Sequence, residues 1–433
     1  MIIAKSVEEA RRRILGKILE EGDQIHSKYG KTLQCRPSLI VVREPEYVEE
    51  IELSCWQICG ESYLDRVEKL IDIAAERLKA KPHTRRVSIP IWLPKDHLCD
   101  TPPAITEVSF LYFNGKLNLT AFIRSLDAYN YFIPNSDFLN YMLEEVSAKS
   151  KLEKGSIAML VSCPHVYARD VERAKNEAEP AKESFGVSSE ATHLVEDYMS
   201  TAWHSALEVV YHGREKQTEW GEIFEGQKVS RFLPRLFIEV RKPEEYQIHD
   251  KAPFTKEYGI EYAHNYVIYA GQIDEPVNKP ILKEGEVYTY AERARYCVDD
   301  NIKVDQLYAC IQKLKEEKCR RDCYVGIARP WDLTSWDPPC LRGYQLFCLG
   351  NRLAGIFYMR SNDIYGAMHT NMFAFAMLTA YVSELTGFST YAYYHFANDA
   401  HIYSEFLDAV REILYPKTPT FSDSISRGRK RYL

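Results

Sequence analysis

The chain carries the same polar pattern twice, and the two copies stand 236 residues apart without a gap. Asp100-Thr-Pro-Pro-Ala104 in the first copy corresponds to Trp336-Asp-Pro-Pro-Cys340 in the second. The polar residues that recur downstream are Arg124-Ser125 and Arg360-Ser361 (360 − 124 = 236), Asp127 and Asp363, Asn135 and Asn371, and His165-Val-Tyr167 and His401-Ile-Tyr403. Most residues between them differ. The pattern predicts a tandem duplication in which one copy kept a cysteine and the other replaced it with alanine.

The repeat extends upstream with looser spacing. Val42-Arg-Glu-Pro-Glu-Tyr47 resembles Val240-Arg-Lys-Pro-Glu-Glu-Tyr246. Arg85-Arg86 precedes Ala104 much as Arg320-Arg321 precedes Cys340, although the spacing is one residue shorter in the first copy. The segment Arg173–Ser189 is charged and contains a proline and a glycine, which is typical of a joint between domains. We therefore expect two domains, residues 1–180 and 190–433, both of ordinary domain size.

Composition excludes several classes of function. The chain has 45% apolar and 27% charged residues and a net charge of −7, so we expect a globular protein that binds no nucleic acid. The basic tail Arg427-Gly-Arg-Lys-Arg431 is interpreted as a solvated end. No apolar run approaches the ~18 residues that span a bilayer, so no membrane contact is expected. The eleven cysteines include no CxxC pair, which favours reduced thiols, a cytoplasmic location and no metal site.

Periodicity predicts α+β domains, each a mixed or antiparallel sheet packed with helices. Apolar residues at helical spacing predict helices, and Ser6 with Glu9 has the spacing of a capping box. Alternating residues around Asn114-Gly115 and Gly350-Asn351 predict β-hairpins. The predicted helices are Val7–Glu21, Phe138–Val146, Tyr198–Tyr211 and Asn371–Leu385, and the predicted strands lie at Ser38–Val42, Glu107–Ile123, Arg235–Val240 and Tyr344–Tyr358.

The second copy resembles thymidylate synthase and its relatives, the pyrimidine-nucleotide hydroxymethylases. The motifs that carry the resemblance, in the family's order, are Arg320-Arg321, Pro339-Cys340, Arg360-Ser361-x-Asp363, Asn371 and Asn398-Asp399-Ala-His401-Ile-Tyr403. The first copy resembles the family only through its match to the second. The resemblance thus implies two thymidylate-synthase-like domains in tandem, with a degenerate first copy.

In this family a cysteine thiolate adds to C6 of a pyrimidine nucleotide, and C5 then attacks a one-carbon electrophile. The resemblance implies that Cys340 is this nucleophile, with Glu261 and Tyr288 as further catalytic candidates. Guanidinium groups suit the nucleotide phosphate, and the amide of Asn371 offers the donor and acceptor that uracil requires. The implied nucleotide ligands are Arg214, Arg360, Ser361, Asn371, His401 and Tyr403, with Arg85 and Arg86 from the first copy. Asp363 is the implied pterin contact.

The chain also departs from the family's pattern. Leu341 stands where the family has a histidine, Met359 where it has a glutamine, and Ala367 where it has a glycine, with Gly366 one position earlier. The family's C-terminal segment that closes over folate is missing or replaced by Tyr415–Leu433. Nucleotide binding and cysteine addition are therefore better supported than reductive methylation. The missing C-terminal segment favours a hydroxymethyl product, because poor closure would admit water. An altered pterin or another electrophile stays equally open.

We therefore expect one-carbon transfer to C5 of a uracil nucleotide, dUMP above all, with methylenetetrahydrofolate or a related pterin. The alternative is a catalytically silent nucleotide-binding or regulatory protein. Family members are symmetric homodimers in which each site borrows the partner's arginine pair, and one tandem chain could build that assembly from its own halves. Arg85-Arg86 would then serve Cys340, and a degenerate site would contain Ala104, Arg124, Ser125, Asn135, His165, Tyr167, Arg320 and Arg321. A homodimer of chains is the competing expectation.

Overall fold

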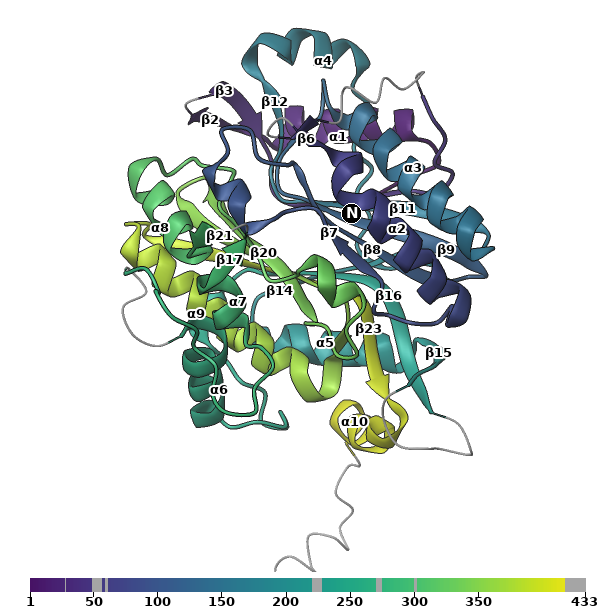
Figure 1. Ribbon diagram of the computed structural model, residues 1–433, viewed down its shortest axis with the longest axis vertical. Coiled ribbons are helices and arrows are strands. Elements are labelled where there is room, and N and C mark those ends of the chain that lie inside the picture. Colours follow the sequence, from purple (N-terminus) through teal and green to yellow (C-terminus); the bar gives the residue numbers. More distant parts are fainter. Residues whose placement is uncertain are drawn as a thin grey trace, which may run out of the picture.

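The computed structural model describes residues 1–27, 29–48, 57–58, 61–219, 228–269, 275–299 and 302–416. They form two halves, and each half is a mixed sheet covered by helices, which confirms the predicted α+β class. Figure 1 shows the purple-to-blue first half lying against the green-to-yellow second half. The two halves meet through their sheets, so the helices lie on the outer faces.

The first half has a six-stranded sheet in the order β1-β4-β11-β9-β8-β7 and a smaller one in the order β10-β12-β3-β2. Its strands are β1 (Ile2–Ala4), β2 (Asp23–Ser27), β3 (Gly30–Gln34), β4 (Ser38–Val42), β5 (Gln57–Ile58), β6 (Glu61–Ser62), β7 (Ser88–Pro90), β8 (Ile105–Phe113), β9 (Lys116–Ile123), β10 (Leu126–Asp127), β11 (Lys154–Val161) and β12 (Pro164–Tyr167). Its helices are α1 (Val7–Glu21), α2 (Tyr63–Ala80), α3 (Phe132–Ser150) and α4 (Val171–Glu177), with short turns η2 (Pro94–Leu98) and η3 (Ala168–Asp170).

The second half has a nine-stranded sheet whose main order is β13-β14-β16-β23-β21-β20-β19, with β15 on β16 and β22 on β23. Its strands are β13 (Gly186–Val187), β14 (Thr192–Glu196), β15 (Arg214–Gln217), β16 (Val229–Val240), β17 (Cys297–Asp299), β18 (Ile302–Val304), β19 (Tyr324–Gly326), β20 (Leu341–Leu349), β21 (Arg352–Met359), β22 (Asn362–Asp363) and β23 (Thr390–Tyr403). Its helices are α5 (Met199–Tyr211), α6 (Lys256–Tyr262), α7 (Tyr290–Arg295), α8 (Gln306–Glu316), α9 (His369–Leu385) and α10 (Leu407–Leu414). It also has the short 3-10 helical turns η4 (Pro243–Glu245), η6 (Pro330–Leu333) and η8 (Ser404–Phe406) and the short π-helices η5 (Ala263–Ile268) and η7 (Ile364–Met368).

The halves repeat their strand pairing at the offset of 236 found in the sequence. In the first half Ser88 on β7 pairs with Ser109 on β8, and in the second half Tyr324 on β19 pairs with Gln345 on β20 (324 − 88 = 236; 345 − 109 = 236). The parallel pairs β10–β12 and β22–β23 repeat in the same way. Shared register over several strands shows that the halves are copies of one architecture.

A β-bulge also recurs at equivalent positions. In the β8–β9 pair the register shifts between Ile105 and Glu107, and in the β20–β21 pair it shifts between Leu341 and Gly343. A bulge bends its strand and redirects nearby side chains. The second bulge directly follows Cys340, so the irregularity lies where the chain turns into the candidate site.

Alternation along the strands explains how the sheets meet. On β4, Leu39 and Val41 pack into the core between the two sheets, whereas Ile40 and Val42 pack beneath the helices. Successive strand residues point to opposite faces, so such a strand is buried on both. Phe122 and Tyr358 stack across the boundary with ring centroids 5.6 Å apart. The core between the sheets makes the two halves one packed unit.

Arg235 fastens the halves at a bend of β16. Its φ of 53° is left-handed, and its side chain is fully buried. The guanidinium donates to Thr120 Oγ1 at 3.0 Å, to Ser156 Oγ at 2.9 Å and to the carbonyl oxygen of Leu119 at 2.9 Å, all in the first half. A buried guanidinium requires such acceptors. This side chain therefore ties the second half to the first.

Most predicted elements are confirmed. Helix α1 has the predicted bounds, and both predicted hairpins form around their Asn-Gly and Gly-Asn turns. Ser6 caps α1 by accepting from the backbone N–H of Glu9 at 3.3 Å. The Glu9 carboxylate accepts from the backbone N–H of Lys5 rather than that of Ser6, so the reciprocal bond of a capping box is not formed. The expectation of uniformly reduced thiols is wrong, because Cys99 is disulfide-bonded, while the other cysteines in the described ranges are free. Within those ranges, every helix is too short or too polar to cross a membrane.

Candidate active site

A cavity of about 350 Å³ opens in the second half where it meets the first half. Its lining residues are Arg85, Arg86, Tyr262, Tyr290, Asp337, Cys340, Met359, Arg360, Ser361, Asn362, Asp363, Ala367, Asn371, His401 and Tyr403. The parallel strands β21 and β23 end here, and ligands commonly bind beyond the carboxyl ends of such strands. Most residues that the sequence predicted for the nucleotide site therefore line one cavity in one chain.

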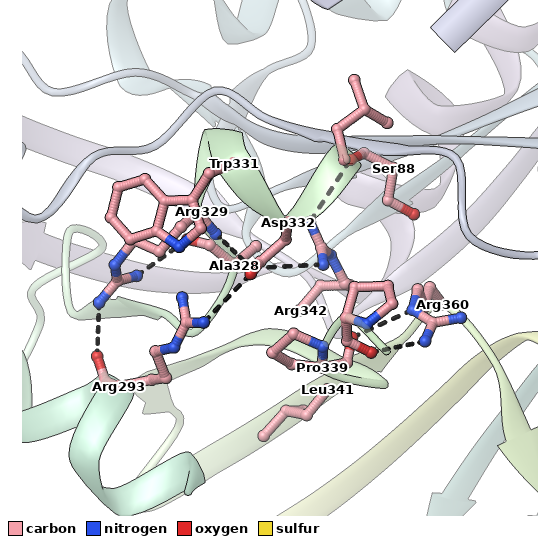
Figure 2. Close-up of polar contacts among 12 residues, drawn as sticks. Ser88, Arg293, Ala328, Arg329, Trp331, Asp332, Pro339, Leu341, Arg342 and Arg360 are labelled. Carbon is pink, nitrogen blue, oxygen red and sulfur yellow. Dashed lines mark hydrogen bonds and ion pairs between the residues drawn. The ribbon is translucent and has the colours of Figure 1, made fainter. Parts of the chain in front are cut away.

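Cys340 lies at the end of a tightly held turn, immediately before β20. Asp332 in η6 accepts from the backbone N–H of Arg329 at 2.8 Å and from Arg293 Nη2 at 3.1 Å. Figure 2 shows the Asp332 carboxylate between the guanidinium groups of Arg293 and Arg342. These contacts hold the segment that leads to Cys340, whose partly exposed side chain reaches the cavity.

Arg360 holds the carbonyl groups that precede the cysteine. Its Nε donates to the carbonyl oxygen of Pro339 at 3.1 Å and its Nη2 to that of Pro338 at 2.6 Å (Figure 2). Nη2 also lies 3.7 Å from Cys340 Sγ. Arg360 therefore both shapes the turn that precedes Cys340 and places a positive charge near its sulfur atom.

Arg85 and Arg86 come from the first half and line the same cavity. The backbone carbonyl of Arg85 accepts from Arg360 Nη1 at 2.8 Å, and Nη2 of Arg85 donates to the hydroxyl of Tyr403 at 2.5 Å. Arg86 donates to Glu219 at 2.8 Å, and its guanidinium lies 4.7 Å from the ring centroid of Trp336. The geometry meets the expectation that the first half supplies arginines to the Cys340 site of its own chain.

A buried ion-pair network stands behind Tyr403. Asp399 is fully buried and accepts from Lys216 Nζ at 2.7 Å, and its Oδ1 lies 2.9 Å from His401 Nδ1 and 3.7 Å from Arg85 Nη1. Burial alone raises the pKa of Asp399, but Lys216 and His401 bring it below its usual range. Burial lowers the pKa of His401, so the ring is neutral at neutral pH. The network orients His401 and leaves its Nε2 without a protein partner among the described residues.

Asn371 lies in the first turn of α9, and its orientation is set by a tyrosine. Its Oδ1 accepts from the hydroxyl of Tyr262 at 3.0 Å. Tyr262 stacks on Tyr266 at 5.2 Å, and Tyr266 meets Tyr290 edge-on at 5.1 Å. Burial raises the pKa of each of these tyrosines, and the proximity of Cys340 raises it further. Their hydroxyls are therefore protonated, and the three rings form a wall of tyrosines near Cys340, two of which line the cavity.

Ser361 and Asp363 follow Arg360 at the end of β21. Ser361 is buried, with Oγ 3.5 Å from His401 Nδ1. Asp363 Oδ1 accepts from the backbone N–H groups of Tyr365 at 3.1 Å and Gly366 at 3.0 Å. A Cβ at Gly366 would lie 2.5 Å from Oδ2, so the glycine keeps that oxygen clear.

The structure does not bring Arg214 to the cavity, and that prediction is wrong. Arg214 begins β15 and contacts Asn114 Oδ1 and the carbonyl oxygen of Ser189, at the hairpin turn of the first half. It lies opposite Phe232 in the β15–β16 pair, whereas Lys216 lies opposite Ser230, the residue that pairs with Tyr403. Lys216, two residues further along the predicted segment, is the cation that the sequence reasoning missed.

Glu261 is also misplaced by the sequence prediction. Its side chain is exposed and does not line the cavity, because successive helix residues point in different directions. Tyr262, the next residue, is the one that reaches Asn371. Tyr288 is half-buried, stacks on Tyr290 at 6.4 Å, and has its pKa raised by burial and then by Tyr266 and Cys340. Tyr288 therefore lies near Cys340 but does not line the cavity.

Arg124 repeats the geometry of Arg360 around Ala104. Its guanidinium donates to the carbonyl oxygens of Pro102 at 2.5 Å, Pro103 at 2.7 Å and Arg321 at 2.9 Å. Half-buried Ser125 follows it, and half-buried Asn135 lies in α3. His165 on β12 meets the ring of Tyr167 edge-on, with centroids 5.4 Å apart.

Arg321 is the structural equivalent of Arg85 (321 − 85 = 236), and its Nη2 lies 3.4 Å from the hydroxyl of Tyr167. Arg320 instead donates to Asp322 at 2.7 Å. The predicted match between the two arginine pairs is therefore off by one residue: Arg85 corresponds to Arg321, and Arg86 corresponds to Asp322. This agrees with the spacing to Ala104, which is one residue shorter than the spacing to Cys340.

Fold and site together define a duplicated α+β protein with one cysteine-containing cavity lined by both halves. A family model described as thymidylate synthase matches residues 7–190 and 256–425, which together exceed half of the chain, so the chain belongs to the thymidylate synthase family. It is 31% identical over 110 residues to "Thymidylate synthase 1/2" of Encephalitozoon cuniculi (strain GB-M1), a match that spans 25% of this chain and only 37% of that relative. The solved thermostable thymidylate synthase A from Bacillus subtilis is 16% identical with a TM-score of 0.40, covering 50% of this chain and 84% of that one.

Proposed function

We propose that the protein transfers a one-carbon unit to C5 of a uracil nucleotide, dUMP above all, through a covalent adduct between Cys340 and C6. The observation that carries this proposal is the cavity in which Cys340, Arg360, Asn371 and His401 converge with Arg85 of the other half. The proposal agrees with membership of the thymidylate synthase family. It assigns the cavity to the nucleotide and the cysteine to the chemistry.

The residues have distinct proposed roles. Cys340 Sγ forms a bond to C6, and the ring electrons move to O4, which Asn371 contacts, so that C5 becomes nucleophilic. After C5 has formed its new bond to carbon, it loses its proton, and departure of the Cys340 thiolate restores the 5,6 double bond. Arg360, Ser361 and Arg85 contact the phosphate, because guanidinium groups and hydroxyls are suitable donors to its oxygens. His401 and Tyr403 contact the ribose.

A reduced pterin fits the site at Asp363. Its Oδ1 is used by the turn that follows β22, whereas no donor in the described part of the chain contacts Oδ2, which Gly366 keeps clear. A carboxylate accepts hydrogen bonds, so this oxygen could hold N–H groups of a pterin ring. When bound, the pterin would supply the one-carbon electrophile. A methyl product would also require a hydride from the reduced pterin, whereas a hydroxymethyl product would require water, so the exclusion of water decides between them.

The proposal is tested by trapping the adduct. The protein is incubated with 5-fluoro-dUMP and methylenetetrahydrofolate, and intact mass followed by peptide mapping locates any added mass. We expect a covalent adduct on Cys340, and none in Cys340→Ser. Cys319→Ser, which alters another partly exposed cysteine, should form the adduct like the wild type. Nucleotide binding without any adduct would instead support the silent nucleotide-binding alternative.

A further inference from the structure

A second cavity, of about 300 Å³, adjoins the candidate active site and shares two of its residues. Arg85 and Arg86 line both cavities. The remaining lining comes from the end of α2 and the chain after it (Ala80–Thr84) and from Lys216–Glu219. Arg85, a proposed phosphate ligand, also contacts Arg360, so the second cavity adjoins the first at residues that are proposed to bind the phosphate.

We propose that this second cavity binds a further phosphoryl group, so that the site accepts a uracil nucleotide carrying a 5′-diphosphate. The inference rests on the proposed function and names its class of substrate. The first phosphoryl group contacts Arg360 and Ser361. The second extends past Arg85 and Arg86 toward Lys81.

The charges of the second cavity support a dianion. Among the described residues that line it, the cations are Lys81, Arg85, Arg86 and Lys216, and the carboxylate is Glu219. Lys216 also pairs with the buried Asp399. Within this described set, four cations against two carboxylates leave an excess of two positive charges. A phosphate monoester carries about −1.5 to −2 charges at neutral pH, which matches this excess.

The cavity already holds an oxyanion of the chain itself. The Glu219 carboxylate lies between Lys81 Nζ at 2.7 Å and Arg86 Nη1 at 2.8 Å. Two cations that converge on a pair of carboxylate oxygens have the geometry that also suits phosphoryl oxygens. The hydroxyls of Thr84 and Thr218 line the same cavity and add neutral donors. A phosphoryl group can therefore take the position that Glu219 holds between Lys81 and Arg86.

Calorimetry tests the proposal with two pairs of probes, dUMP against dUDP and UMP against UDP, so that the sugar does not affect the comparison. In the wild type we expect the diphosphate of at least one pair to bind about tenfold more tightly than its monophosphate, which corresponds to one or two additional charge-assisted hydrogen bonds. Lys81→Glu should remove most of that advantage and leave monophosphate binding within about threefold, because Lys81 does not line the first cavity. Lys79→Glu makes the same charge change on an exposed residue two positions away and should alter neither.

The outcomes separate the two proposals. A diphosphate that binds no more tightly than its monophosphate, or an advantage that Lys81→Glu and Lys79→Glu reduce equally, overturns the diphosphate inference. If dUMP still binds and 5-fluoro-dUMP still forms its adduct in that case, the proposed function stands. Failure of every uracil nucleotide to bind would overturn both.

Discussion

On the proposed function, the choice of base depends on Asn371, whose side chain is oriented by Tyr262. Its Oδ1 accepts from the tyrosine hydroxyl, so Nδ2 is the donor left for the ring. Uracil presents an acceptor at C4, whereas cytosine presents an amino donor that would oppose Nδ2. A mismatched buried polar pair costs about 1–3 kcal/mol. We expect calorimetry to show roughly tenfold to hundredfold tighter binding of dUMP and UMP than of dCMP and CMP. If dCMP and CMP bind as tightly as dUMP and UMP, or more tightly, Asn371 does not select uracil.

Tyr262→Phe should weaken this discrimination without preventing binding. Once the hydroxyl is gone, the amide can turn over, and cytosine can be satisfied as well as uracil. We expect the uracil preference to fall by about tenfold, the effect of about one hydrogen bond. Tyr266→Phe removes a hydroxyl from the same stack without touching Asn371 and serves as the control. A loss of affinity that is equal for both bases would show that Tyr262 only supports the wall.

Cys340→Ser should abolish turnover and spare nucleotide binding. The serine hydroxyl is far less nucleophilic than a thiolate near neutral pH, while the two side chains are of similar size. Turnover and dUMP affinity are measured side by side in the wild type and the variant. Retention of most of the wild-type rate would mean that Cys340 does not form the proposed adduct.

At the scale of elements, the duplicated turns η2 and η6 offer a matched comparison. Asp96 and Asp332 are equivalent (332 − 96 = 236), both are buried, and each accepts from a backbone N–H at 2.8 Å and from an arginine. The first turn leads to Ala104 and the second to Cys340. The same substitution at the two positions therefore separates stability from chemistry.

Asp96→Asn and Asp332→Asn should each lower the free energy of unfolding by about 3 kcal/mol, because each leaves a largely buried arginine without its carboxylate. Urea denaturation measures the loss. Only Asp332→Asn should also slow adduct formation with 5-fluoro-dUMP, measured where both variants are folded. Equal slowing by the two variants would show that η6 does not position Cys340 specifically.

At the scale of the whole molecule, the two halves build one site within one chain. We expect light scattering to give a mass near 50.3 kDa at all protein concentrations. A mixture of Arg85→Ala and Cys340→Ser chains should recover no activity, because both residues must come from the same chain. Restored activity in the mixture would show that the site forms between chains, as in the competing homodimer.

The sequence predicted well what local signals and the repeat determine. The Asn114-Gly115 turn specifies its hairpin, and the constant offset placed Arg360, Asn371 and His401 in one site. Lys216 and Tyr262 were not predicted, because only the strand pairing and the helix orientation in the folded chain distinguish them from Arg214 and Glu261. One residue along a helix changes the direction of a side chain, which separates Glu261 from Tyr262. Asp399 lies two residues before His401 in the same motif, so its role as a partner of His401 was within reach of the sequence.

The constant register between the halves bears on how such a protein can change. In a dimer of identical subunits every substitution appears twice, so neither site can vary alone. Here Lys216 and Asp399 form a buried ion pair, while the positions that match them by strand register are Ile25 and Cys163. One gene that encodes both halves lets one copy lose its ion pair and its cysteine while the other copy keeps them. On the proposed function, the first half then takes no part in the covalent chemistry, yet it still supplies Arg85 to the cavity of the second half.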